Sequence, residues 1–311
     1  MTRSSALAVF VGGNEPFAAT IENDWIVGPF RRPTNNSSHE AGTIHDDNTA
    51  RQLGFRSGTI AGSIHFEQFL PLCEHVFGGA WEHSGTMVLY FVNPSIDREP
   101  VQAMIGCQEQ VVGERRLRAV AMKSSAGLTI LEGSATLGGI DADSKLRQRF
   151  NQACGARARD VRMLAGVPIG FEAHNMPTQI PQAEIDARVN IITERRPEFS
   201  DSGIHGRTVA PLSAAIHALR VFEDHLPIAA KTFIGMFGGI EWQYRNGPVF
   251  ADYPYCVSGR VAAIGESPKT EMLWYECTLH DPAAKTDVAR MLMLSRLLKA
   301  TSPLWAGESK D

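Results

Sequence analysis

Histidine and acidic side chains are concentrated in the segment 38–55, which reads SHEAGTIHDDNTARQLGF. At its centre, His45 is followed directly by Asp46 and Asp47. The imidazole of histidine titrates near neutral pH, so His45 can serve as a general base, and an adjacent carboxylate can orient it or share in proton transfer. Acids that precede a short helix also serve as caps. We therefore take these three side chains as candidate catalytic residues, with capping as the alternative for the two aspartates.

The composition is that of a folded protein of ordinary polarity. Of the 311 residues, 43% are hydrophobic and 21% are charged, and the net charge is −4. These values exclude a mostly disordered chain, and the lack of a basic excess argues against a nucleic-acid-binding protein. No apolar run approaches the roughly 18 residues of a membrane-spanning helix. We expect a cytoplasmic protein that binds neither nucleic acid nor membrane.

No sequence pattern points to a metal or a cofactor. The five cysteines are dispersed without a CxxC pair, which argues against a zinc ribbon and a disulfide framework. His39 and Glu40 do not have the spacing to His45 that a zinc-binding HExxH helix requires. The chain has no GxGxxG, P-loop or GxSxG motif, so Rossmann enzymes, P-loop ATPases and common serine hydrolases are disfavoured. We expect neither a metal nor a cofactor.

Short sequence matches recur in the same order in the two halves of the chain. The tripeptide 59–61 (TIA) recurs as 208–210 (TVA), the segment 90–94 (YFVNP) recurs as 244–248 (YRNGP), and 31–33 (RRP) recurs as 195–197. Their shared order indicates a tandem duplication.

The spacing of these matches differs between the two copies. Pro33 and Thr59 are 26 positions apart, whereas Pro197 and Thr208 are 11 positions apart. We interpret the difference as an insertion in the first copy that includes the segment 38–55. A duplicated fold with such a segment in one copy alone predicts a single working site.

Periodicity predicts the same order of elements in each copy, namely a strand, a buried helix and a run of antiparallel strands. In the first copy we expect a helix over 63–77, interrupted near Pro71, and a short helix over 48–53. The strands expected there are 21–30, 87–92, 101–112, 117–124 and 128–137. In the second copy we expect a helix over 212–225. Its expected strands are 189–193, 239–244, 255–264, 271–280 and 288–298, the last of which also fits a helical period. We divide the chain into a first domain (1–140), a partly helical linker (141–184) and a second, degenerate domain (185–311).

A helix wrapped by an antiparallel sheet and made twice in one chain is the α+β double hotdog arrangement. The segments 44–50 (IHDDNTA), 54–55 (GF), 58–62 (GTIAG) and 91–94 (FVNP) resemble the MaoC-like group of that superfamily, which includes (R)-specific enoyl-CoA hydratases and related dehydratases. The resemblance covers about residues 20–140, and it covers 185–300 through the order of strands.

The resemblance implies roles for individual residues. His45 falls on the catalytic histidine of the family, and Glu40 stands where the family has its catalytic aspartate. Gly42 replaces the asparagine of the family signature, which is a departure from the hydratase pattern. The N–H of Gly62, at the start of the central helix, would stabilise the developing enolate oxygen of the substrate. The remaining candidate substrate-binding residues are Arg56, Ser57, Gly58 and His65.

The function that these observations favour is hydration or dehydration of an acyl group held as a thioester on coenzyme A or a carrier protein. The alternatives are a hotdog thioesterase or acyltransferase, a dehydratase or cyclase whose substrate is not a thioester, and a non-catalytic acyl-binding module. Hotdog units pair through their sheets, so the chain would form its own pseudo-dimer, and a homodimer of whole chains is also plausible.

Overall fold

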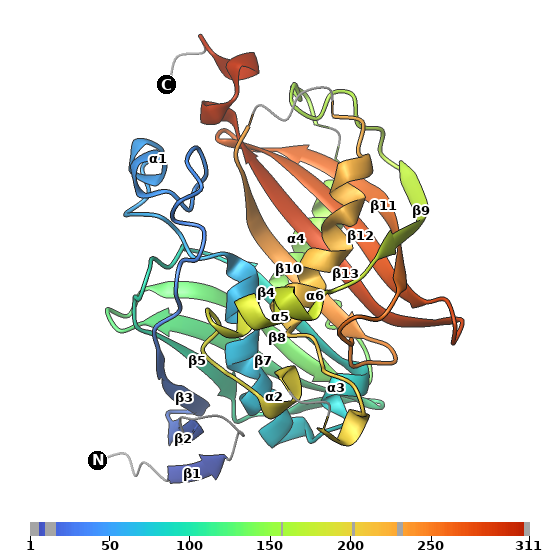
Figure 1. Cartoon of the computed structure of the whole chain (residues 1–311). Helices are drawn as coiled ribbons and strands as arrows, with labels where there is room; N and C mark the ends of the chain where they lie inside the picture. Colours follow the sequence, from blue (N-terminus) through green and yellow to red (C-terminus); the bar gives the residue numbers. More distant parts are fainter. Residues whose placement is uncertain (1–5, 10–16, 157, 201–202, 229–232, 308–311) are drawn as a thin grey trace.

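The computed structural model describes residues 6–9, 17–156, 158–200, 203–228 and 233–307. Its strands form one antiparallel sheet in the order β1-β2-β3-β5-β7-β8-β4-β10-β13-β12-β11-β9, and β6 pairs with β7 beside this path. Figure 1 shows the sheet as two curved halves, with α2, α5 and α6 lying between them in front of the strands. The helix α4 packs on the opposite face, where Leu146 joins a small core with Val88 and Trp274.

The first half of the sheet comes from the N-terminal part of the chain. Its strands are β1 (Ala6–Val9), β2 (Phe17–Glu22), β3 (Trp25–Arg31), β4 (Gly85–Phe91), β5 (Val101–Gly106), β6 (Gln110–Val112), β7 (Arg115–Ser124) and β8 (Thr129–Leu137). Its helical segments are α1 (Asp47–Gln52), the 3₁₀ turns η1 (Gly62–His65) and η2 (Glu67–Phe69), α2 (Leu70–Phe77) and α3 (Trp81–Ser84). The helix expected over 63–77 is thus two 3₁₀ turns followed by an α-helix. Pro71 stands in the first turn of α2, where its missing N–H has no intrahelical partner to lose.

The second half of the sheet comes from the C-terminal part of the chain. Its strands are β9 (Glu172–Thr178), β10 (Gly235–Tyr244), β11 (Tyr255–Glu266), β12 (Thr270–Asp281) and β13 (Thr286–Leu298). Its helical segments are α4 (Lys145–Gly155), α5 (Gln182–Val189), η3 (Pro197–Phe199), η4 (Gly203–His205), α6 (Leu212–Leu219), η5 (Arg220–His225), η6 (Lys299–Thr301) and η7 (Pro303–Trp305). The segment 288–298 is a strand, and the expected helical linker contains α4.

The two copies share individual hydrogen bonds as well as element order. The side-chain amide of Asn93 donates from Nδ2 to the carbonyl of Thr129, and that of Asn246 donates to the carbonyl of Asp287, both at 2.8 Å. Both asparagines follow the strands that meet at the centre of the sheet, β4 and β10. The sequence matches 90–94 and 244–248 therefore mark a structural repeat.

Three of the expected strands are wrong. The segment 101–112 is interrupted after Gly106 and forms β5 and β6 rather than one strand. The segment 21–30 is a hairpin rather than one strand, because Asn23 and Asp24 take left-handed conformations (φ 45° and 46°) and form the two-residue turn between β2 and β3. The segment 189–193 contains the end of α5 and the turn after it. Its β-branched residues resemble a strand, but Ile185 and Ile192 are buried and, with Val189, follow the spacing of one helical face.

The expected insertion in the first copy is also wrong. Arg31 is the last residue of β3, whereas its sequence match, Arg195, lies beyond α5 rather than at the end of β9. Thr59 and Val209 are equivalent, because each forms an isolated bridge to the loop after the central strand of its copy. Measured from the ends of β3 and β9, 28 positions lead to Thr59 and 31 lead to Val209. We call the stretch from the end of β3 to Thr59, and that from the end of β9 to Val209, the connecting segment of each copy. The two connecting segments differ in residue type more than in length.

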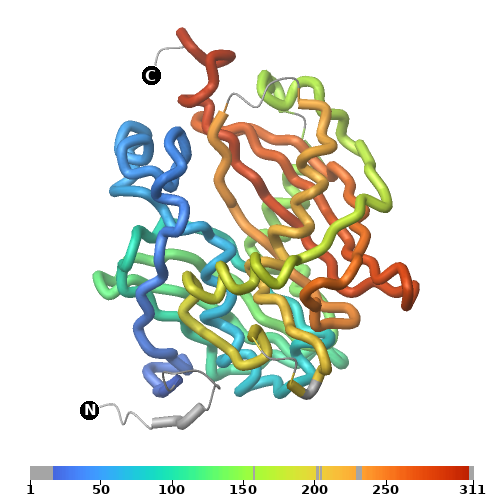
Figure 2. Tube along the Cα trace, viewed as in Figure 1, coloured from blue at the N-terminus to red at the C-terminus, as the bar shows by residue number. Residues whose placement is uncertain are grey.

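The connecting segment of the second copy crosses onto the first copy, as the trace in Figure 2 shows. There Glu194 receives hydrogen bonds from Arg31 Nε at 2.5 Å and Nη2 at 3.0 Å, and both side chains are buried. Arg196, also buried, pairs with Glu74 at 2.5 Å and with Glu82. These ion pairs join the two copies on the side of the sheet that carries the central helices.

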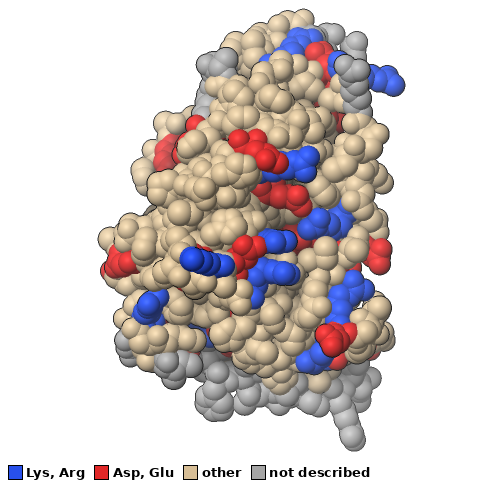
Figure 3. Space-filling view, turned by 90° about the vertical axis from the view of Figure 1, so that its right-hand side faces the viewer, with Lys and Arg blue, Asp and Glu red and all other residues tan. Residues whose placement is uncertain are grey.

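The outer surface mixes charges of both signs. Figure 3 shows positive and negative side chains next to one another on the face turned toward the viewer. Among the surface pairs, Arg260 of β11 lies 3.6 Å from Glu172 of β9. Within the part of the chain that the structure describes, no helix is long and apolar enough to cross a membrane.

We predict that Glu194→Gln lowers the free energy of unfolding by about 1.5–3 kcal/mol, because it removes the negative charge to which two donors of the buried Arg31 guanidinium bond. The matched control is Glu184→Gln in the same segment, whose partner Arg188 is 3.9 Å away and whose carboxylate is 41% exposed. That change should cost less than about 1 kcal/mol. Urea unfolding of both variants checks the prediction, and equal losses would contradict it.

Candidate active site

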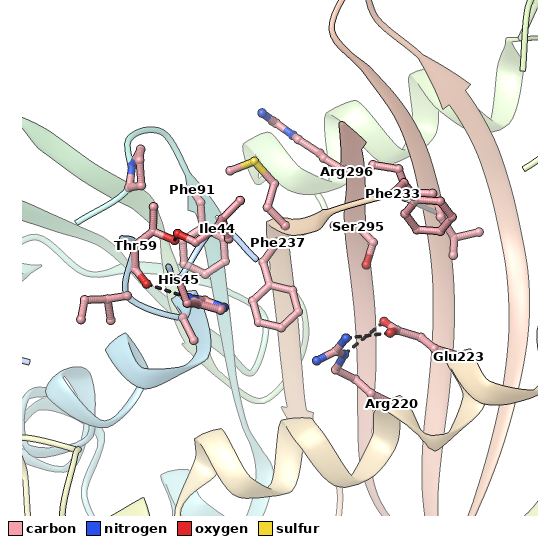
Figure 4. Close-up of a pocket in the computed structure, with 18 of the residues that line it drawn as sticks. Ile44, His45, Thr59, Phe91, Arg220, Glu223, Phe233, Phe237, Ser295 and Arg296 are labelled. Carbon is pink, nitrogen blue, oxygen red and sulfur yellow. Dashed lines mark hydrogen bonds and ion pairs between the residues drawn. The ribbon is translucent and has the colours of Figure 1, made fainter. Parts of the chain in front are cut away.

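A cavity of about 430 Å³ lies between the two copies. The pairing of β4 with β10 ends at Tyr90 and Gly239, and the register of β10 shifts just before this point. Beyond it the rings of Phe91 and Phe237 line the cavity. One wall comes from the connecting segment and η1 of the first copy, and the other comes from η5 and β13 of the second copy (Figure 4).

His45 lies in the wall from the first copy, and its ring points into the cavity (Figure 4). Its Nδ1 is 2.7 Å from the carbonyl oxygen of Thr59. Because a carbonyl oxygen only accepts hydrogen bonds, Nδ1 carries the proton of the neutral ring and Nε2 carries the free lone pair. The imidazole is therefore fixed in the tautomer that a general base needs.

The backbone around His45 is held by two close contacts. Asn35, which is buried, donates from Nδ2 to the carbonyl of His45 at 2.8 Å. Gly58 passes so near this carbonyl that a Cβ at position 58 would lie 2.2 Å from its oxygen. Gly58, which was predicted to bind substrate, therefore packs against the backbone of His45 instead.

The three candidate acids lie outside the lining of the cavity. Asp46 caps α1 by accepting from the amide of Thr49 at 2.8 Å, and this backbone bond lowers the pKa of Asp46. Asp47 accepts from the Ser57 hydroxyl at 2.6 Å and from the Gly58 amide at 2.8 Å. Glu40 is exposed on the loop before His45. The two aspartates hold the connecting segment in place, and the structure does not bring Glu40 to the imidazole.

Gly62 and His65 both line the cavity. Gly62 is the first residue of η1, so its N–H has no acceptor within that turn. A Cβ at this position would lie 2.7 Å from the ring of Phe91, so only glycine fits without a shift. His65 Nε2 is 2.8 Å from the Ser95 hydroxyl, and burial lowers the pKa of His65 to about 4. His65 is therefore neutral at physiological pH and fixes Ser95 in the wall.

Arg56 is anchored beside the cavity. Its guanidinium donates to both carboxylate oxygens of Glu99 at 2.8 Å and to the carbonyl of Pro94 at 2.9 Å. Pro94 lines the cavity, so Arg56 positions part of the wall. Ser57 is engaged by Asp47 and also accepts from Arg51 at 3.0 Å.

Sequence reasoning missed the wall from the second copy. Arg220 donates from Nε and Nη2 to Glu223 at 3.2 and 2.8 Å, and both residues line the cavity. Burial acts to lower the pKa of Arg220, but the charge of Glu223 outweighs it and raises the pKa above its usual range. One sequence signal could have indicated this wall. Arg220 and Glu223 stand three positions apart at the end of the helix expected over 212–225, a spacing that suits an ion pair.

The position equivalent to His45 holds phenylalanine in the second copy. The amide of Thr59 donates to the carbonyl of the residue before His45, and the amide of Val209 donates to the carbonyl of the residue before Phe199. Phe199 is 1% exposed and belongs to the hydrophobic core. The second copy thus has an apolar side chain where the first has the candidate base.

Glu67 is a buried acid of the central helical segment that does not line the cavity. One carboxylate oxygen accepts from the amide of Ser213, at the start of α6, at 2.7 Å, and the other has no hydrogen-bond partner in the described structure. Burial raises the pKa of Glu67 to about 7, although the hydrogen bonds from Ser213 act to lower it. Among the described residues, no group of three or more His, Cys, Asp or Glu is arranged to hold a metal ion.

Solved structures share this architecture. A protein described as a MaoC domain dehydratase from Chloroflexus aurantiacus has a TM-score of 0.57 at 10% identity, over 88% of this chain and 94% of that one. A conserved protein from Mycobacterium tuberculosis with a double hotdog fold has a TM-score of 0.55 at 10% identity, over 86% and 93%. This chain therefore has a double hotdog fold. A MaoC-like dehydratase also shares it, with a TM-score of 0.50 at 11% identity, over 86% and 95%.

The double hotdog fold confirms the predicted α+β architecture. No family model matches the sequence, and no curated protein matches it. At identities near 10%, the likeness to solved structures concerns the fold and leaves the chemistry to the residues of the cavity.

We predict that Gly58→Ala lowers the free energy of unfolding by about 1–3 kcal/mol, because the added Cβ must displace the backbone of His45. Gly79→Ala is the control, since a Cβ at position 79 meets nothing within 4 Å. That change should stay within about 0.5 kcal/mol. Chemical unfolding of the two variants gives the comparison, and a neutral Gly58→Ala would contradict the described contact.

The pKa of Glu67 predicts a pH-dependent effect of Glu67→Gln. Between the ordinary carboxyl pKa of 4.5 and the folded value of about 7, the folded protein binds more protons than the unfolded chain. The contribution of Glu67 to stability therefore falls as pH rises through this window. Relative to the wild type, Glu67→Gln should be more stable at pH 8 than at pH 5 by about 2–3 kcal/mol.

Urea unfolding at the two pH values measures this difference, and the other titrating groups cancel because both proteins carry them. The same relative stability at pH 5 and pH 8 would mean that Glu67 titrates normally in the folded protein.

Proposed function

We propose that the protein hydrates an α,β-unsaturated acyl thioester or, in the reverse direction, dehydrates a β-hydroxyacyl thioester. The observation that carries the proposal is the imidazole of His45, which is held through Nδ1 by the carbonyl of Thr59 and has its basic Nε2 at a cavity that Gly62 also lines. A base and a backbone N–H at one cavity are the groups that this reaction requires. The double hotdog fold shared with MaoC-like dehydratases supports the proposal.

In the hydration direction, Nε2 of His45 removes a proton from water, and the hydroxide adds to the β-carbon of the enoyl group. Electrons move to the thioester oxygen, where the N–H of Gly62 stabilises the enolate. The enolate then collapses as the α-carbon takes the proton from the imidazolium. Because Glu40 is exposed and the aspartates hold the loop, we assign both proton transfers to His45, with the Thr59 carbonyl stabilising the ring while it is charged.

The second copy contributes the opposite wall rather than a second site. The phenyl ring of Phe199 has no lone pair that could accept a proton, so the equivalent position there cannot supply a base. We propose that the first domain, 1–140, provides the chemistry and that the second domain closes the cavity. The second domain, expected over 185–311, is extended in this proposal to include β9, which pairs with β11. We further propose that the thioester belongs to coenzyme A or a carrier protein.

The acid of the central helix argues for hydration over thioester hydrolysis. A hydrolytic reading would use Glu67 as the catalytic acid, but its carboxyl group is buried against the amide of Ser213 and lies outside the lining of the cavity. We therefore propose the hydratase reading as the primary one.

We predict that His45→Gln reduces the hydration of crotonyl-CoA, followed as loss of enoyl absorbance, by about 10²–10⁴-fold in kcat. His39→Gln is the matched control, because His39 is an exposed histidine of the same segment and should leave the rate unchanged. Release of free thiol, followed with a chromogenic disulfide, measures hydrolysis in parallel. Retention of activity in His45→Gln, or thiol release without hydration, would overturn the proposal.

A further inference from the structure

The cavity has a second polar wall that the proposed chemistry does not use. It comes from the second copy, where Arg220 and Glu223 of η5 lie near Ser295 of β13, across the cavity from His45 (Figure 4). Burying polar and charged groups is costly unless their hydrogen bonds are made. A ligand that covers this wall without making hydrogen bonds to it would therefore bind with a free-energy penalty.

The ion pair in this wall has a fixed geometry. Nε and Nη2 of Arg220 bond the two oxygens of Glu223, and the Tyr275 hydroxyl donates to the same carboxylate at 2.5 Å. The guanidinium also packs on the ring of Phe237, 5.1 Å from its centroid. Neither bond to Glu223 uses Nη1. Figure 4 shows one end of the guanidinium directed away from Glu223, toward the space beside His45.

The charges of this wall discriminate between classes of ligand. Glu223 neutralises Arg220, so a ligand carboxylate would give up the hydration of its charge without gaining a free counter-charge in this wall. A plain hydrocarbon would displace water from Nη1 and from the Ser295 hydroxyl without replacing the hydrogen bonds. A hydroxyl or carbonyl oxygen accepts from Nη1, bonds with Ser295 and carries no charge.

We propose that the cavity accepts an acyl group with a neutral hydroxyl or carbonyl oxygen remote from the thioester, recognised by Arg220 and Ser295. The proposal rests on the proposed function in placing the thioester at His45 and Gly62. The ring of Phe237 lies between the two polar walls and Phe91 lies on the side of His45 (Figure 4), so the two rings suit the carbon chain that joins the two ends of the ligand. Arg220 and Ser295 are thus specificity-determining residues, and they take no part in proton transfer.

The test is the binding of saturated, unreactive acyl-CoA ligands, measured by titration calorimetry. The ligands are hexanoyl-CoA, its derivatives with a hydroxyl on carbon 4, 5 or 6, 5-oxohexanoyl-CoA and glutaryl-CoA. At least one neutral oxygenated ligand should bind about tenfold more tightly than hexanoyl-CoA. Glutaryl-CoA should bind no more tightly than hexanoyl-CoA. Equal affinities for the hydrocarbon and the oxygenated ligands, or the tightest binding for glutaryl-CoA, would overturn the proposal.

Two variants locate the recognition. In Arg220→Met and in Ser295→Ala the preference for the oxygenated ligand should fall at least threefold, while the affinity for hexanoyl-CoA changes less than twofold. A uniform loss for every ligand would place Arg220 against the coenzyme A moiety and overturn the proposal. Ser295→Ala leaves the Arg220–Glu223 pair intact. If Arg220→Met does not fold, Ser295→Ala therefore still tests whether this wall recognises the ligand oxygen.

Binding and turnover separate the two proposals. If the wild type shows the preference but hydrates no enoyl-CoA, the proposed function fails and the specificity stands. If it hydrates crotonyl-CoA and shows no preference, the specificity alone fails.

Discussion

The pairing of β4 with β10 is the interaction on which the rest of the structure depends. Five residue pairs, from Thr86 with Gln243 to Tyr90 with Gly239, join the sheets of the two copies into one. At the last pair, the Leu146 side chain of α4 packs against Gly239. A Cβ at position 239 would lie only 2.5 Å from that side chain. Beyond this pair the strands separate, and the space between them becomes the cavity. The position of the site is thus a consequence of where the central ladder ends.

The same pairing accounts for the single site that we propose in this duplicated fold. A pseudo-symmetric sheet presents each connecting segment to the opposite copy, so two equivalent positions arise. In the first copy that position holds His45, supported by Asn35 and Gly58. In the second it holds Phe199, which is part of the core, and the neighbouring Arg196 is occupied by the carboxylates of the first copy. One position retains a titratable group beside a cavity, while the other stabilises the junction between the copies.

Much of the architecture could be predicted from the sequence. The alternation of apolar and polar residues in strands, and their spacing in helices, are local patterns that match the elements of the folded chain. The strands β7, β8, β10, β11 and β12 and the short helix α1 lie where periodicity placed them. The errors came where local signals conflict: a run of β-branched residues disguised the end of α5, and a chance Arg-Arg-Pro match suggested an insertion. Asn23 and Asp24 are turn-forming residues within an apolar run, and here the turn prevails over the continuous strand that the run predicts.

The candidate site was predictable only in part, for physical reasons. The resemblance of 44–50 to MaoC-like enzymes picked out His45, and the position of Gly62 at the start of the central helix picked out its N–H; both residues line the cavity. The cap that Asp46 forms with Thr49 follows the usual N-cap spacing and was one of the two roles expected for it. The roles of Asp47 and Arg56 depend on hydrogen bonds to Ser57 and Glu99, which no spacing rule encodes. The Arg220–Glu223 wall depends on how the second copy docks, which is tertiary information.

A crystal structure with butyryl-CoA, a saturated and unreactive ligand, tests the central claim most directly. The account predicts the thioester oxygen within hydrogen-bonding distance of the Gly62 amide, the β-carbon facing Nε2 of His45, and the acyl chain between the two copies. An acyl chain bound at Phe199 or on the outer face of the sheet, or a thioester remote from His45, would contradict it.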